Sequence, residues 1–219
     1  TPRFRSRKSV ALPLACLLAF LSIASLFVGV IDLSWSTLWT DPEALELIAV
    51  SRGPRTIAVV ISGGALAVSG AIMQMLVRNR FVEPMTAGTG QGAALGILLA
   101  TLFAPAASVF VKMILASLTA LAAGAGFLAI VHRLPPTQPL LVALVGLIYG
   151  GILGAAVIFV AYQADLLQYV EVWMNGEFSG VLQGRYELLW LVAFVAALAY
   201  LAADQFTIIG MGRTASVNL

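Results

Sequence analysis

Charged side chains are scarce in this sequence, and their scarcity decides the class of protein. Only 10% of the 219 residues are Asp, Glu, Lys or Arg, whereas a soluble domain carries roughly 25%. Apolar residues make up 61% of the chain, and the mean hydropathy is +1.00. So few charges cannot cover a water-facing surface, which excludes a soluble enzyme, a disordered chain and a nucleic-acid binder. The composition indicates an integral membrane protein.

The residue types that usually bind metals or carry out catalysis are also nearly missing. One cysteine, Cys16, and one histidine, His132, allow no intrachain disulfide and no cysteine-based four-ligand metal site. Neither of the two lysines, Lys8 and Lys112, follows a glycine, so the phosphate-binding loop G-x-x-x-x-G-K-S/T is missing. We therefore expect no catalytic residue, metal site or cofactor in this chain. Any ATP and Mg²⁺ would be bound by a separate chain.

Six apolar stretches are long enough, or nearly so, to cross a bilayer as helices, which takes about 20 residues each. They are residues 10–31, 56–77, 85–104, 109–131, 140–162 and 187–203. The alternative for the first stretch is a cleaved signal peptide, but the stretch is longer than the apolar core of such a peptide, about 7–15 residues. The sequence predicts an all-α, polytopic membrane helix bundle that forms a single transmembrane domain over residues 1–219.

The distribution of positive charges predicts the orientation of these spans. With a cytoplasmic N-terminus, eight Lys and Arg side chains lie in cytoplasmic segments and four in outer segments, as the positive-inside rule requires. The eight are Arg3, Arg5, Arg7, Lys8, Arg78, Arg80, Arg133 and Arg213, and the four are Arg52, Arg55, Lys112 and Arg185. We therefore expect both ends of this sequence in the cytoplasm.

The interior of the spans carries polar but no ionisable side chains. Ion-coupled transporters and membrane enzymes place ionisable groups near the midplane of the bilayer, so both classes are disfavoured. Gln74 and Tyr149 are polar groups that we expect along a translocation path. Glycines at four-residue spacing, such as Gly146, Gly150 and Gly154, predict close packing between helices.

Two segments outside the spans carry distinctive patterns. The first, residues 51–55, reads S-R-G-P-R, and Pro54 stiffens the backbone between Arg52 and Arg55. Arginine is suited to bidentate pairing with carboxylates, and anchoring at the membrane surface is the alternative role. The second, residues 78–84, reads R-N-R-F-V-E-P and joins the second and third spans. Its alternative is a plain charged turn.

These segments form part of a longer pattern. It reads R-x-P-R at residues 52–55, S-G-A-x-x-Q at 69–74, R-N-x-x-x-x-P at 78–84, W-M-N-G-E-F-S-G at 173–180, G-R-Y-E-L-L at 184–189 and G-M-G-R-T-A-S-V-N-L at 210–219. The pattern resembles the permeases of iron-chelate and vitamin B12 ABC importers. The variants around residues 78–89 and 184–190 resemble the ferric-siderophore branch, in particular permeases for catecholate-type siderophores.

The sequence departs from the family pattern at several points. Members of the family have about ten spans, whereas six are expected here, so the chain resembles the N-terminal two thirds of a permease. It stops where the cytoplasmic coupling helices begin, and we expect either a fragment or part of a longer chain, which should not transport alone. Arg213 stands where an acid is expected, and Arg80 replaces the commoner proline after Asn79.

The resemblance implies a permease subunit that moves a ferric siderophore across the cytoplasmic (inner) membrane of a bacterium. The implied partners are a second permease subunit, two ATP-binding subunits, a periplasmic or lipoprotein substrate-binding protein and the lipid bilayer. Permeases for vitamin B12 or haem are alternatives, as is a truncated membrane scaffold that does not transport.

The resemblance also implies roles for individual residues. Arg52 and Arg55 would pair with acidic residues of the binding protein. Asn79 and Phe81 match an inner gate, where Phe81 would act as an apolar plug, and a second gate lies near Thr137 and Gln138. The segment 209–219 would begin the contact with the ATPase, through Gly210, Met211, Gly212 and Arg213.

Overall fold

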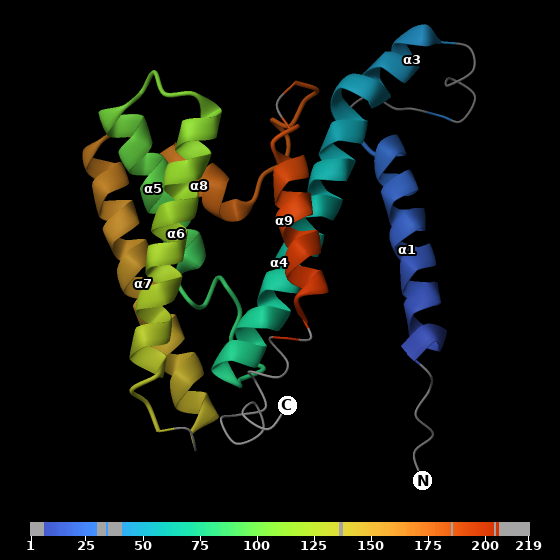
Figure 1. The fold of residues 1–219 in the computed structure, drawn as a ribbon. Helices are drawn as coiled ribbons and strands as arrows, with labels where there is room; N and C mark the ends of the chain where they lie inside the picture. Colours follow the sequence, from blue (N-terminus) through green and yellow to red (C-terminus); the bar gives the residue numbers. More distant parts are fainter. Residues whose placement is uncertain are drawn as a thin grey trace. The chain divides into compact units, whose positions relative to one another are not determined.

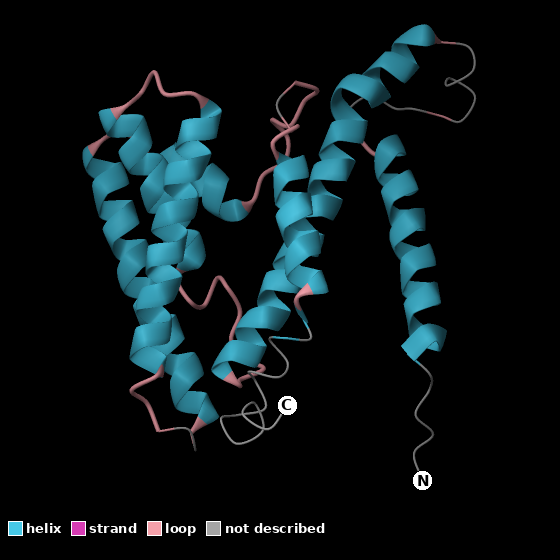
Figure 2. Cartoon of the chain, viewed as in Figure 1, coloured by secondary structure: helices cyan, strands magenta, loops and turns pink. Residues whose placement is uncertain are grey.

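The computed structural model describes residues 7–29, 34, 41–135, 138–184, 186–203 and 205 (Figure 1). Figure 2 shows helices and loops, and no strand, among these residues. The helices are α1 (Arg7–Phe27), α3 (Pro42–Leu47), the π-helix η1 (Ile48–Arg52), α4 (Gly53–Val77), α5 (Thr89–Phe103), α6 (Val109–Val131), α7 (Pro139–Gln163), α8 (Leu167–Asn175) and α9 (Leu189–Leu201). The predicted all-α class is confirmed.

Four helical stretches of the described residues are long and apolar enough to cross a membrane. They are Val10–Phe27, Pro42–Val77, Val109–Val131 and Leu140–Gln163. The apolar helices α5 and α9 have 15 and 13 residues. At 1.5 Å per residue they extend about 22 and 20 Å, which is less than the roughly 30 Å of a bilayer core. The chain is a multi-pass membrane protein, and the number of six spans stays a prediction.

Two of the predicted spans match the helices closely. The span 109–131 coincides with α6, and α7 exceeds the span 140–162 by one residue at each end. By contrast α5 starts at Thr89, four residues after the predicted start at 85. Gly88 precedes it in the left-handed region with φ 76°, which ends the turn before the helix.

Three short elements were not predicted, because hydropathy does not detect them. α3 begins after Asp41, whose side chain accepts a hydrogen bond from the backbone N–H of Glu43 at 3.0 Å. α3 continues through η1 into α4. α8 lies between α7 and the loop that leads to α9, and it ends at Gly176 with φ 67°.

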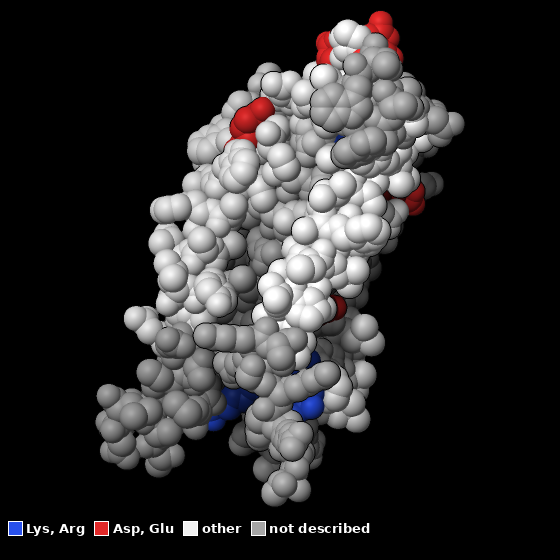
Figure 3. Space-filling view, turned by 90° about the vertical axis from the view of Figure 1, so that its right-hand side faces the viewer, with Lys and Arg blue, Asp and Glu red and all other residues white. Residues whose placement is uncertain are grey.

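The chain divides into two compact units, which we describe separately. Unit 1 contains residues 1–63 and 178–191, and unit 2 contains residues 64–177 and 192–219. In unit 1 the acidic residues Asp41, Glu43 and Glu46 are exposed on and before α3. Figure 3 shows acidic side chains at that end of the helix. The prediction of a single domain stays a prediction.

Close contact between α5 and α6 organises unit 2, where both helices lie beside α7 (Figure 1). A methyl group on Gly92 would lie 2.7 Å from the Cβ atom of Ala123, and one on Gly96 would lie 2.8 Å from the Cα atom of Ala116. Such distances are too short for a side chain, so these glycines set the separation of the two helices. Small residues therefore bring α5 and α6 close together, although Gly92 and Gly96 were not among the glycines predicted to do so.

Two apolar clusters fill the core of unit 2. The first joins α5, α7 and α8 through Ala94, Leu98, Val157, Ala161 and Val170. The second joins the turn before α5 to α6 and α7 through Val82, Ala87, Phe127 and Val142. Because Val82 and Ala87 are fully buried, the turn between α4 and α5 is folded into the core and is not a plain charged turn.

Candidate functional site

The S-R-G-P-R segment lies where η1 passes into α4. We call this region, Val50–Arg55 together with the loop Phe178–Gly184, the arginine junction. All of it belongs to unit 1. Pro54 is buried within a continuous helical stretch and has no N–H group to donate to the carbonyl of Val50, four residues earlier. The backbone N–H of Gln183 donates to that carbonyl instead, at 2.9 Å. Pro54 therefore leaves the carbonyl of Val50 available, and the loop is attached to that carbonyl.

The π-helix has a local cause at the same place. The backbone N–H of Gly53 donates to the carbonyl of Ile48, five residues earlier, which is the π-helical pattern. A methyl group on Gly53 would lie 2.8 Å from that carbonyl oxygen. Glycine therefore permits the tight backbone that the widened turn requires.

Arg52 is buried in unit 1, with 6% of its surface exposed. Its Nη1 atom donates to the carbonyl oxygen of Leu26, in the last turn of α1, at 2.9 Å. Carbonyls in the last turn of a helix lack intrahelical partners, and an arginine side chain can satisfy one of them. The geometry thus ties Arg52 to the end of α1. Its predicted role in binding-protein docking stays a prediction.

Arg55 lies one helical turn further on and has a different environment. It is partly buried, and its Nη2 atom donates to the carbonyl oxygen of Ser179 at 3.3 Å. Within the described part of the chain, its Nε atom is buried and has no hydrogen-bond partner. Arg55 therefore holds the loop by one long bond and retains an unsatisfied donor beside it. Its docking role also stays a prediction.

The turn Arg78–Gly88, between α4 and α5 in unit 2, contains the predicted inner-gate residues Asn79 and Phe81. Asn79 is only 4% exposed. Its backbone N–H donates to the carbonyl of Gln74, and its Oδ1 atom accepts the backbone N–H of Phe81 at 2.9 Å. Asn79 thus fixes the turn from inside it.

Phe81 itself points away from the core, with 66% of its surface exposed. The neighbouring Val82 is fully buried. The structure therefore assigns the packing role in this turn to Val82 and leaves Phe81 available to contact something outside unit 2. The role of Phe81 as an inner gate stays a prediction.

The other predicted sites fall at the edge of the described residues or beyond it. Gln138 is exposed and immediately precedes α7, where its backbone carbonyl accepts the N–H of Leu141. Thr137 lies outside the described residues, as do the ATPase-contact residues Gly210, Met211, Gly212 and Arg213.

The two residues expected along a translocation path have different surroundings. Gln74 lines a pocket of about 340 Å³ beside α4, together with Glu83 and Pro84 of the turn. Tyr149 on α7 instead donates its hydroxyl to the carbonyl of Ala123 on α6 at 2.9 Å, and its ring packs on Phe127. These contacts account for Tyr149 as part of the helix packing.

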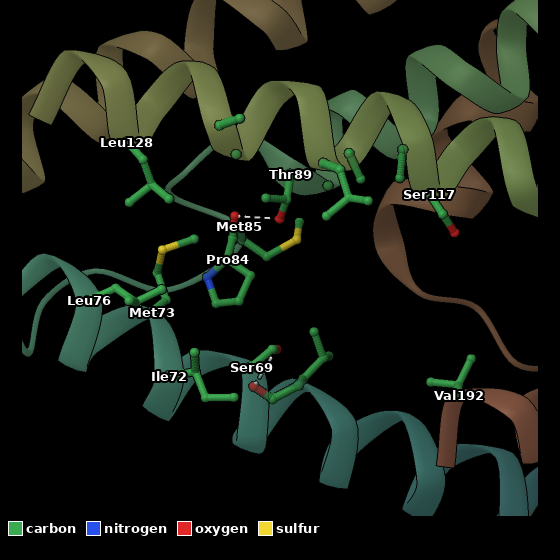
Figure 4. Close-up of a pocket in the computed structure, with 17 residues that line it drawn as sticks. Ser69, Ile72, Met73, Leu76, Pro84, Met85, Thr89, Ser117, Leu128 and Val192 are labelled. Carbon is green, nitrogen blue, oxygen red and sulfur yellow. Dashed lines mark hydrogen bonds between the residues drawn. The ribbon is translucent and has the colours of Figure 1, made fainter. Parts of the chain in front are cut away.

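A larger pocket, of about 830 Å³, lies between α4, the turn before α5, and α6 (Figure 4). Its lining is mainly apolar, and its hydroxyl groups already donate to backbone carbonyls. These bonds join Ser69 to Leu66, Thr89 to Pro84 and Ser117 to Met113. The pocket can therefore accept an apolar group, and it offers little to a polar solute.

Sequence reasoning missed the bonds that attach the loop Phe178–Gly184 to the junction. A signal for one of them was present, because a proline inside a helical stretch has no N–H group for the carbonyl four residues before it. Only the structure shows that the donor to this carbonyl is the backbone N–H of Gln183.

The comparison with protein families decides which family the chain belongs to. The model of the FecCD transport family matches residues 17–219. The chain belongs to the FecCD transport family. Among curated proteins, it is 44% identical over 205 residues to the petrobactin import system permease protein YclN of Bacillus subtilis (strain 168), covering 93% of this chain and 65% of YclN.

A second relative of this FecCD family member is the ferric-anguibactin transport system permease protein FatD of Vibrio anguillarum (strain ATCC 68554 / 775). It is 40% identical over 206 residues, covering 93% of this chain and 66% of FatD. This chain therefore spans just under two thirds of the length of these relatives.

A solved structure shares the fold of this FecCD family member. It is described as an inward-facing metal-chelate type ABC transporter, and it matches with a TM-score of 0.72 at 22% identity. The match covers 94% of this chain and 65% of that one.

Proposed function

We propose that this chain is part of the permease subunit of an ABC importer that carries a ferric siderophore across the bacterial cytoplasmic membrane. The observation that carries this proposal is the 44% identity, over 93% of the chain, to a petrobactin import permease. The identity to a ferric-anguibactin permease supports the same substrate class. Relatives that import vitamin B12 are more distant, at 33% identity over 81% of the chain.

The proposed assembly has the partners that such importers need. A second permease subunit completes the path, two separate ATP-binding subunits supply the energy, and a substrate-binding protein delivers the iron complex. The chain lacks a phosphate-binding loop of its own, which is consistent with this division of labour. We place the N-terminus in the cytoplasm, because eight of the twelve Lys and Arg residues then lie on that side.

The candidate sites have roles within this assembly. The arginine junction lies on the outer side and receives acidic residues of the binding protein, with Arg55 as the partly exposed basic group. The turn Arg78–Gly88 lies on the inner side, where Phe81 forms an apolar gate and Asn79 holds the turn in shape. Apolar constrictions block polar solutes by excluding water. Gln74 lines the path beside that turn.

Uptake in cells tests the substrate class. Bacteria that lack their own siderophore and vitamin B12 permeases would receive the complete permease with its ATPase and binding protein. We expect accumulation of iron supplied as a ferric catecholate siderophore and no accumulation of radiolabelled vitamin B12. Uptake of vitamin B12 alone would show that the permease belongs to the vitamin B12 branch of the family. Uptake of neither substrate would contradict the proposal.

A further inference from the structure

The smaller pocket of unit 2, of about 340 Å³, differs in chemistry from the larger apolar one. We call it the Gln74–Glu83 pocket, after the two polar side chains that line it. Its other lining residues are apolar or small: Leu66, Ala67, Gly70, Ala71, Pro84 and Met85. The pocket therefore combines one carboxylate and one carboxamide with apolar walls.

Small residues of α4 create the hollow. Ala67, Gly70 and Ala71 precede Gln74 by one to two turns and share its face of the helix. Pro84 approaches this face at Gly70, where a methyl group would lie 3.9 Å from its Cδ atom. Larger side chains at these positions would fill the space between α4 and the turn, so the small residues keep the pocket open.

Glu83 is presented from a turn whose backbone is fixed. Its N–H donates to Oγ1 of Thr86 at 3.0 Å, and its carbonyl accepts from the same hydroxyl at 2.9 Å and from the N–H of Ala87 at 3.1 Å. Within the described residues, the hydrogen bonds of Glu83 are thus made by its backbone, and the carboxylate is available to an outside group. Arg78 and Arg80, the basic residues of the same turn, are exposed and do not line the pocket.

The acceptors of the pocket favour a cation that also has an apolar part. An ionised carboxylate only accepts hydrogen bonds, and the carboxamide oxygen adds a further acceptor. A hydrogen bond from a charged N–H group to a carboxylate is about twice as strong as a neutral one. Leu66 and Met85 offer apolar surface to methylene groups. Mg²⁺ and Ca²⁺ take about six or more oxygen ligands, which one carboxylate does not supply. An alkylammonium group fits these features.

We propose that the Gln74–Glu83 pocket binds a protonated amine of the transported siderophore complex, with Glu83 as the charged acceptor and Gln74 as the amide acceptor. The inference rests on the proposed function, because it requires a ferric siderophore on the path beside α4. It adds a feature of the substrate, namely an amine on a short alkyl arm. A lysine of a partner subunit is the other source of an alkylammonium group, and the experiment separates the two.

Uptake of two ferric siderophores that differ in one amine tests the inference. One is a synthetic catecholate siderophore with an aminobutyl arm, and the other has the same arm with its amine acetylated, which removes the charge and leaves the iron-binding groups unchanged. In proteoliposomes with the complete importer, we expect kcat/KM for uptake to be about tenfold higher for the amine form, as one charge-assisted hydrogen bond predicts.

Variants of the pocket should remove this preference. Glu83→Gln keeps the shape of the side chain and deletes its charge, so the two siderophores should be taken up within about twofold of each other. Gln74→Leu removes the neutral acceptor and should reduce the preference to about threefold. Glu171→Gln deletes an exposed carboxylate of α8, outside the pocket, and is the control that should keep the full preference. Because the side chain of Glu83 is exposed, Glu83→Gln should keep the unfolding temperature of the wild type.

The outcomes distinguish this inference from the proposed function. If the wild type takes up neither siderophore, the proposed function fails, and the inference fails with it. If both are taken up and acetylation has the same effect, or none, in the wild type and in Glu83→Gln, the proposed function stands and the inference is overturned. If Glu83→Gln lowers the uptake of both siderophores by the same factor and weakens assembly with a partner subunit, the pocket receives a lysine of that subunit, which also overturns the inference.

Discussion

The hydroxyl group of Tyr149 on α7 donates a hydrogen bond of 2.9 Å to the carbonyl oxygen of Ala123 on α6. The same ring lies against Gly88, where a methyl group would come within 2.9 Å of it. One tyrosine therefore connects α6, α7 and the turn that starts α5. This arrangement explains why a polar aromatic residue occurs in the middle of α7.

Removal of that hydroxyl should have a small, measurable effect. Tyr149→Phe keeps the ring contact with Phe127 and deletes only the hydrogen bond. We expect the protein in detergent to lose about 1 kcal/mol of stability, measured by thermal unfolding. Tyr162→Phe, at an exposed position of the same helix, is the control and should change nothing. A loss of transport in Tyr149→Phe at unchanged stability would instead place the hydroxyl on the translocation path.

The close approach of α5 and α6 predicts a larger effect for one added methyl group. In Gly92→Ala the new Cβ atom would lie 2.7 Å from the Ala123 Cβ and 2.8 Å from the carbonyl oxygen of Thr119. The helices must separate to admit it, at a cost of about 1–3 kcal/mol. Gly151→Ala on α7 is the matched control, because nothing described lies within 4 Å of its Cβ position. Equal unfolding temperatures for the two variants would contradict this packing.

Phe81 and Val82 are adjacent apolar residues with opposite environments, which makes them a matched pair. Phe81→Ala should leave stability unchanged, because the side chain is 66% exposed, and should increase leak of small solutes through the assembled transporter. Val82→Ala should lower stability by about 1–3 kcal/mol, as core truncations do. Solute leak can be followed by fluorescent dye release from proteoliposomes. A destabilised Phe81→Ala without leak would show that the gate lies elsewhere.

The orientation argued from the charges can be tested by cysteine labelling. In a Cys16→Ala background, a cysteine at the exposed position Glu46 should react with an impermeant reagent added from outside. A cysteine at the exposed position Gln138 should react only after the membrane is opened. The reverse pattern would invert the topology.

The sequence predicted the long apolar helices well. It was less accurate where the backbone conformation of a single residue decides where a helix begins. The span 109–131 matches α6 because the apolar run starts directly after the capping residue Ser108 and ends directly before His132. The start of α5 was misplaced by four residues, since hydropathy cannot show that Gly88 adopts a left-handed conformation. α3 and α8 are too short to be found as spans.

The candidate site was predictable as a motif but not as a geometry. The spacing in S-R-G-P-R drew attention to both arginines, yet nothing in the sequence shows that Arg52 is buried and Arg55 partly exposed. That difference arises from contacts with residues far along the chain. Leu26 lies 26 residues before Arg52, and Ser179 lies 124 residues after Arg55.

The measurement that tests the central claim most directly is transport by the reconstituted importer. The complete permease, its ATPase and its binding protein would be placed in liposomes, and the accumulation of a radiolabelled ferric catecholate siderophore would be followed. We predict accumulation of the siderophore inside the vesicles that requires both ATP and the binding protein. Equal siderophore levels with and without ATP, in vesicles whose ATPase is active, would contradict it.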